Sequence, residues 1–160
     1  MAKIESSLKQ PAIFLSTLGG IGYLPKAPGT WASLITLAPV FFIQKYTGPL
    51  GLIVFCSLIF IIGIWACTHH EILTKSHDPK HCVIDECLGQ SLVLLFTPND
   101  PMFYLLAFVY FRFFDIVKPW PTNWFDRNVK GGLGVMFDDI VAGAQAIIAM
   151  ILTHKLLNVF

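Results

Sequence analysis

The feature that most constrains this chain is an uncharged run, PLGLIVFCSLIFIIGIWAC, over residues 49–67. A transmembrane helix needs about 20 consecutive apolar residues, so this run is long enough to cross a bilayer. The whole chain is 55% hydrophobic and 13% charged, whereas an average soluble domain has about 25% charged residues. The sequence therefore predicts a small membrane protein.

Shorter apolar segments predict the rest of the fold, and they cover residues 32–44, 88–97, 102–111 and 140–153. A helix of about ten residues is roughly 15 Å long, half the thickness of the hydrocarbon core, so some segments are too short to span fully. Pro39 predicts a kink, and the Gly- and Pro-rich stretch at 19–31 predicts a loop. We expect an all-α fold with a single domain over residues 1–160, a compact helical membrane bundle of about 4–5 apolar helices.

Charged residues divide unevenly between the two ends of these segments if the segments cross the membrane out and back. One side then carries Lys3, Lys9, Lys26, Lys75, Lys80, Arg112, Lys118, Arg127 and Lys130, and the other carries Lys45 and Lys155. Loops rich in Lys and Arg stay in the cytoplasm, so the first side is predicted to be cytoplasmic. The same side holds every acidic residue except Asp100, which places all the candidate chemistry on one face.

Two pairs of adjacent carboxylates lie directly against apolar runs, Asp85–Glu86 in VIDECLG and Asp138–Asp139 in GVMFDDIVAG. Carboxylates in such a setting are costly unless something binds them. Hard divalent cations such as Mg²⁺ or Ca²⁺ take oxygen ligands, so we predict that all four residues bind a metal ion. The alternative is that each pair opens a helix, where the helix dipole stabilises an acid by about 0.3–1 kcal/mol.

Basic residues near these acids predict a phosphate-binding site. Arg112, Asp115 and Lys118 recur every three residues in FRFFDIVKPWP, which places them near one helix face. Arg offers a planar fork and Lys a point charge to phosphate oxygens, although a surface ion-pair ladder is the alternative. In the glycine-rich loop, Lys26 and Thr30 lie beside backbone N–H groups that can face an anion, but the loop lacks the G-K-[ST] ending of a P-loop.

Other ligands and other classes of protein stay open at this point. A zinc site would use the residues of one loop, namely His69, His70, His77, His81, Cys82 and Cys87, whose spacings match no common zinc pattern. His77–Asp78 is a candidate proton-transfer pair. Because the net charge is +1 and there is no long basic run, we expect no nucleic-acid partner. The rival classes are a small ion channel or transporter and a peripheral or soluble all-α protein.

Four motifs resemble those of the bacterial phosphatidylglycerophosphatase A family. They are GIGYLPKAPGTWAS at 20–33, HDPKHCVIDECLGQ at 77–90, FRFFDIVKPWP at 111–121 and GGLGVMFDDIVAG at 131–143. The resemblance implies an α-helical enzyme of the bacterial inner membrane with its active site on the cytoplasmic face. It would hydrolyse phosphatidylglycerophosphate, a phospholipid in the bilayer, to phosphatidylglycerol and inorganic phosphate in phospholipid biosynthesis, with Mg²⁺ as cofactor. Another lipid phosphate monoester is the alternative substrate.

The resemblance also implies roles for individual residues. The expected catalytic carboxylates are Asp85, Glu86, Asp115, Asp138 and Asp139, of which the two pairs would also hold Mg²⁺. The expected phosphate-binding residues are Arg112, Lys118, Lys26 and Thr30. Two alternatives stay open: attack by a metal-activated water or by an Asp nucleophile, and Asp115 as a metal ligand, a base or the orienting partner of Arg112.

Overall fold

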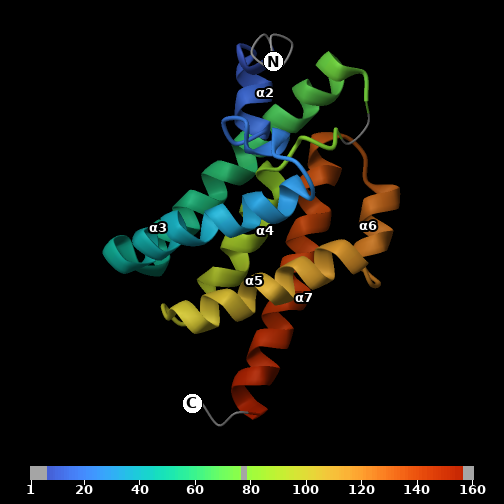
Figure 1. Cartoon of the computed structure of the whole chain (residues 1–160). Coiled ribbons are helices and arrows are strands. Elements are labelled where there is room, and N and C mark those ends of the chain that lie inside the picture. The colour runs from blue at the N-terminus through green and yellow to red at the C-terminus, as the bar shows by residue number, and fades with distance from the viewer. Residues whose placement is uncertain (1–6, 77–78, 157–160) are drawn as a thin grey trace.

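The structure, a computed structural model, describes residues 7–76 and 79–156. In that part of the chain all regular structure is helical (Figure 1), with the elements α2 (Pro11–Ser16), the 3₁₀ helix η1 (Ile21–Tyr23), α3 (Pro28–Thr74), α4 (Ile84–Leu95), α5 (Pro101–Val117), α6 (Thr122–Asn128) and α7 (Gly131–Leu156). The predicted all-α class is therefore confirmed for the described residues. His77 and Asp78, the candidate proton-transfer pair, lie outside them.

The long helix α3 is two helical arms, 28–47 and 49–74, joined at Gly48. Gly48 has φ 68° and ψ −167°, a conformation that glycine adopts without the steric cost that a Cβ brings. The chain reverses direction at this point (Figure 1). Pro39 lies inside the first arm, and Gly48 is where α3 departs from helical angles, so the predicted kink at Pro39 stays a prediction.

Several helices extend beyond the apolar segments that predicted them. α3 continues to Thr74, α5 to Val117, and α7 begins at Gly131, so the stretches between the predicted apolar segments are partly helical. The side chains at these helix ends are polar. Hydropathy cannot distinguish polar residues at the end of a helix from polar residues in a loop. One consequence corrects an expectation: Asp138 lies about two turns inside α7, so the second acidic pair does not open its helix.

The central element is α4, most of which is buried, as shown by Ile84, Cys87, Leu88, Gly89, Gln90, Ser91, Val93 and Leu94. It packs against α3, α5 and α7. Its contact with α7 is close at two glycines: a Cβ built on Gly89 would lie 2.9 Å from the carbonyl oxygen of Asp139, and one on Gly143 would lie 3.1 Å from the carbonyl oxygen of Gly89. This close approach brings the first acidic pair beside the second.

The helix ends gather at two poles of the bundle. At one pole, Arg112 of α5 contacts Ser33 of α3 and Glu86 of α4. At the other pole, the Tyr104 hydroxyl of α5 donates to Gln44 of α3. The apolar segments therefore run out and back between two ends, and the predicted catalytic carboxylates lie at the first end.

Large apolar side chains are exposed over much of the outer surface, among them Phe42, Leu58, Ile61, Leu105, Val109, Ile148 and Leu152. Exposed apolar area of this extent marks a binding or membrane surface. In the described part of the chain, α3 and α7 are the helices long and apolar enough to cross a membrane. The 12 residues of α4 make roughly 18 Å of helix, too short to cross, as the short apolar segment 88–97 predicts.

Candidate active site

A cavity of about 300 Å³ opens at the first pole, between α4, the end of α5, α6 and the start of α7. Its walls carry six carboxylates, which belong to Asp85, Glu86, Asp115, Asp126, Asp138 and Asp139. The basic residues that line it are Lys80 and Lys118. Acids outnumber basic residues three to one, so the cavity attracts cations.

Three of the carboxylates converge on one point. One oxygen from each of Asp85, Glu86 and Asp139 lies within 4.8 Å of the other two, which makes these residues the candidate metal-binding group in the described part of the chain. Asp85 Oδ1, Glu86 Oε2 and Asp139 Oδ2 are buried and accept no hydrogen bond. Buried carboxylate oxygens without partners are costly, and a hard divalent cation supplies what they lack. These residues fit the Mg²⁺ that the motifs imply.

The cluster also perturbs the acidity of its own members. Burial, and then the charge of Glu86, raises the pKa of Asp85 well above its ordinary value. Burial raises the pKa of Glu86 to about 7, although the nearby Arg112 guanidinium lowers it. Because the ionised forms are destabilised in this way, a bound cation would be needed to keep both carboxylates charged.

Asp138 differs from its neighbour Asp139. Its Oδ2 accepts from Lys118 Nζ at 2.5 Å, while Lys118 also pairs with Asp126 of α6. Burial lowers the pKa of Lys118, but the charge of Asp138 and the bonds to both carboxylates raise it above its ordinary value. The predicted set of four metal ligands is therefore divided, with three residues converging and Asp138 held in an ion pair.

Lys118 does not share a helix face with Arg112 and Asp115. It is the residue that follows α5, in a left-handed conformation with φ 45°, so its side chain leaves the helix and reaches α7. Arg112 and Asp115 do form an ion pair, which was the alternative to phosphate binding, with Nη1 and Oδ2 2.5 Å apart. Asp115 is therefore the partner of Arg112 and also lines the cavity, and its role as a metal ligand or a base stays a prediction.

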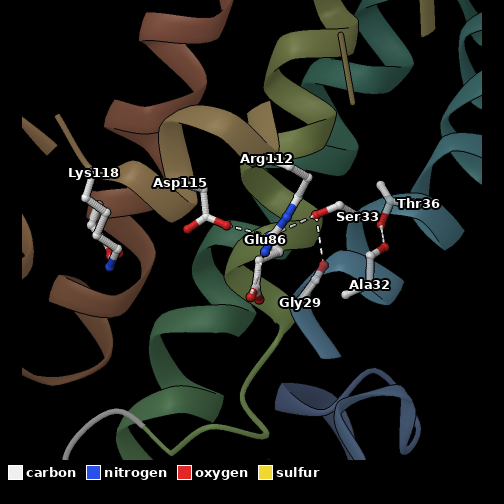
Figure 2. Close-up of polar contacts among 9 residues, drawn as sticks. Gly29, Ala32, Ser33, Thr36, Glu86, Arg112, Asp115 and Lys118 are labelled. Carbon is white, nitrogen blue, oxygen red and sulfur yellow. Dashed lines mark hydrogen bonds and ion pairs between the residues drawn. The ribbon is translucent and has the colours of Figure 1, made fainter. Parts of the chain in front are cut away.

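Arg112 links three helices (Figure 2). Its Nη1 lies 3.4 Å from Ser33 Oγ and 4.0 Å from Glu86 Oε1. Ser33 in turn donates to the carbonyl oxygen of Gly29 in the first turn of α3. Arg112 thus places its positive charge beside the acidic cluster and ties α5 to α3 at this pole.

The glycine-rich loop supports the cluster from outside the cavity. A Cβ on Gly29 would overlap the Glu86 carboxylate, so only glycine lets the start of α3 approach that acid so closely. Lys26 and Thr30, the predicted phosphate ligands of this loop, are not among the cavity-lining residues. Lys26 is exposed in the turn before α3, and Thr30 is half-buried in its first turn.

The histidines of the predicted loop are dispersed. His69 Nδ1 lies 2.8 Å from the carbonyl oxygen of Trp65, and His70 Nδ1 lies 2.7 Å from Ser16 Oγ. His81 Nδ1 lies 2.8 Å from the carbonyl oxygen of Gly22. Within the described ranges no zinc-type group of His and Cys forms, so these histidines position helices instead.

Sequence reasoning missed Lys80 and Asp126 as cavity residues. Lys80 had a signal, since it lies in the motif HDPKHCVIDECLGQ five residues before Asp85. Asp126 had no comparable signal: it reaches the cavity because α6 folds back onto α7.

Comparison with known proteins covers nearly the whole chain. The family model described as Phosphatidylglycerophosphatase A matches residues 14–154. A protein of that name from Haemophilus influenzae is 34% identical over 145 residues, covering 90% of this chain and 89% of the relative. Another of that name from Escherichia coli is 37% identical over 145 residues, covering 89% and 83%.

A third relative carries a different name. It comes from Bacteroides thetaiotaomicron, is provisionally named a phosphatidylinositol-3-phosphatase, and is 36% identical over 152 residues, covering 88% of this chain and 94% of the relative. No solved structure matches the fold of this chain.

Proposed function

This chain belongs to the phosphatidylglycerophosphatase A family and is a phosphatase, and we propose that it hydrolyses phosphatidylglycerophosphate to phosphatidylglycerol and inorganic phosphate. The observation that carries the proposal is the convergence of Asp85, Glu86 and Asp139 in a cavity at one pole of the bundle. Carboxylates arranged in this way are suited to hold a cation against a phosphate group. An ion path is not supported, because the acids gather at one end and not along the bundle.

The proposed cofactor is Mg²⁺, held by Asp85, Glu86 and Asp139 through the oxygens that lack protein partners. A divalent cation bound there would neutralise charge on the phosphate oxygens and lower the pKa of a bound water. Arg112 supports this arrangement by favouring the ionised form of Glu86. Asp115 orients Arg112 through their ion pair and lines the same cavity as the cluster.

The proposed location is the bacterial inner membrane, with the cavity at the cytoplasmic face. The exposed apolar surfaces of α3 and α7 support contact with acyl chains. In the out-and-back arrangement predicted from the sequence, the cavity residues lie on the side with most of the Lys and Arg residues, which favours the cytoplasmic side. A phospholipid could then keep its acyl chains in the bilayer while its headgroup enters the cavity, and the product would serve phospholipid biosynthesis.

The test is phosphate release from phosphatidylglycerophosphate by the purified protein in detergent micelles, with Mg²⁺ and with EDTA. We expect release that requires Mg²⁺ and exceeds release from phosphatidic acid. Equal rates with and without EDTA would remove the cation from the proposal. Failure to release phosphate from the lipid under any divalent cation would remove the proposed reaction.

A second substrate follows from the third relative, whose provisional name is phosphatidylinositol-3-phosphatase. The same site would accept the phosphate monoester of that lipid, because none of the cavity residues described above is specific for glycerol. The assay therefore includes phosphatidylinositol 3-phosphate. Faster release from it than from phosphatidylglycerophosphate would reassign the substrate and leave the metal-binding cluster in place.

A further inference from the structure

Two of the basic residues near the cluster are already occupied by carboxylates. Arg112 pairs with Asp115 and lies 4.0 Å from Glu86. Lys118 pairs with Asp126 and Asp138. These ion pairs offset part of the charge of both cations, whereas a basic residue that pairs with no carboxylate keeps its full charge for the phosphate.

Lys80 is the remaining basic residue on the cavity wall, and it is exposed. No salt bridge in the described part of the chain involves its ammonium. Its backbone is held on both sides: Pro79 is buried and accepts from the N–H of Cys82 at 2.7 Å, and His81 bonds to Gly22. A charged side chain on a fixed backbone at the cavity wall suits a ligand that enters from solvent.

The charge of the substrate makes such a group necessary. A phosphate monoester carries about −1.5 to −2 charges at neutral pH, and the cavity presents six carboxylates to it. A cation held by three of these carboxylates offsets only part of the repulsion. The Lys80 side chain at the cavity wall, which forms no ion pair with a described residue, would offset more of it and would give the phosphate a charge-assisted hydrogen bond.

We propose that Lys80 binds the phosphate group on which this enzyme acts, both as the terminal phosphate of the lipid and as the inorganic phosphate product. Arg112 and Lys118 differ from Lys80 because both pair with carboxylates. This inference rests on the proposed phosphatase function and names a binding residue for the same site.

The experiment measures two properties of the purified protein in detergent with Mg²⁺. The first is KM and kcat for phosphatidylglycerophosphate, and the second is the dissociation constant of inorganic phosphate by calorimetry, which needs no turnover. The variants are Lys80→Ala and Lys80→Arg, with Lys130→Ala as the matched control. Lys130 is also an exposed lysine near this pole, but it does not line the cavity.

We expect Lys80→Ala to raise both KM and the dissociation constant of inorganic phosphate by about tenfold, because a hydrogen bond between charged groups is lost. kcat should change little, since the contact exists in the ground state and in the transition state alike. Lys80→Arg keeps a positive charge, so both constants should stay within about twofold of the wild-type values. Lys130→Ala should have the wild-type KM and dissociation constant.

The proposal is overturned if Lys80→Ala binds inorganic phosphate as tightly as the wild type, or if the wild type binds no phosphate. These outcomes differ from failure of the proposed function, which would appear as a wild type that releases no phosphate from the lipid. If the wild type hydrolyses the lipid and Lys80→Ala has the same KM as the wild type, the proposed role of Lys80 is excluded and the proposed function is not affected. Melting curves of all variants check the fold.

Discussion

At the residue scale, Asp138 and Asp139 are adjacent in the sequence but have different contacts in the structure. Asp139 presents an oxygen close to Asp85 and Glu86, whereas Asp138 lies outside that group and binds Lys118 through Oδ2. The two side chains leave α7 about 100° apart because a helix has 3.6 residues per turn. Neighbours in sequence therefore meet different elements.

The first prediction concerns Asp139→Asn, which keeps the size of the side chain and removes its charge. We expect a loss of phosphate release of about a hundredfold or more, together with weaker metal binding, because the carboxamide offers a poorer oxygen ligand. An assay of phosphate release measures the loss of activity, and electron paramagnetic resonance of bound Mn²⁺ measures the weaker metal binding.

The matched control is Asp100→Asn at the opposite pole. Asp100 caps α5 by accepting from the N–H of Met102 and Phe103, and Asn caps a helix about as well. This variant should keep wild-type activity. Full activity in Asp139→Asn would exclude Asp139 from the metal site.

At the element scale, the position of the cavity depends on how closely α4 approaches α7. A Cβ on Gly89 would meet both the Phe111 ring and the carbonyl oxygen of Asp139, so only glycine permits the observed distance. The segment after α5 is also fixed to α7, because Thr122 donates to Gln145 Oε1 at 2.6 Å and Gln145 Nε2 donates to the carbonyl oxygen of Trp120 at 3.0 Å. These contacts fix where the carboxylates meet.

The second prediction is that Gly89→Ala lowers the free energy of unfolding by about 1–3 kcal/mol, the usual cost of overpacking a core. It should also reduce activity, since the added methyl group separates Asp139 from the acids of α4. Ser57→Ala is the control, because Ser57 is exposed, does not line the cavity and donates to the carbonyl oxygen of Ile53 one turn earlier in the same helix. Thermal melting and phosphate release give the two readouts, and an active, stable Gly89→Ala would contradict the argument.

The third prediction concerns Gln145→Ala, which removes both anchors of the segment 118–122. Each neutral hydrogen bond contributes about 0.5–1.5 kcal/mol, so we expect a fall in stability of about 1–3 kcal/mol and a smaller fall in activity as Lys118 loses its fixed position. Gln145→Glu keeps the oxygen that Thr122 binds and should lose less in both measurements. Equal losses in the two variants would show that the bond to Trp120 alone holds the segment.

At the scale of the whole molecule, the outer surface and the buried polar pole suit different surroundings. Exposed apolar side chains on α3 and α7 favour a lipid environment, and the acidic cavity favours an aqueous edge where ions and headgroups are found. A molecule with this division would lie in the membrane with its cavity at the surface.

The fourth prediction is that the protein stays in the membrane pellet after sodium carbonate extraction and leaves it only with detergent, because apolar area on this scale is costly in water. A peripheral protein treated in parallel should be released by carbonate. Release of this protein by carbonate would favour the peripheral all-α alternative and would require another partner for its apolar surface.

Much of this protein could be predicted from its sequence because the relevant signals are local. Apolar runs predict helices, and alternating apolar and charged blocks place the acids at one end. The spacing of Arg112 and Asp115 offers an ion pair as the alternative to phosphate binding, and that pair is present. The helix ends were predicted less well, since polar residues at the end of a helix and in a loop have the same hydropathy.

The tertiary structure alone decided which groups meet. It separated Asp138 from Asp139, took Lys118 out of α5, left Lys26 outside the cavity, and brought Lys80 and Asp126 into it. These outcomes depend on the crossing of α4 and α7 and on the path of the chain between helices. Such contacts join residues far apart in the chain, and local sequence patterns carry no information on the distances between them.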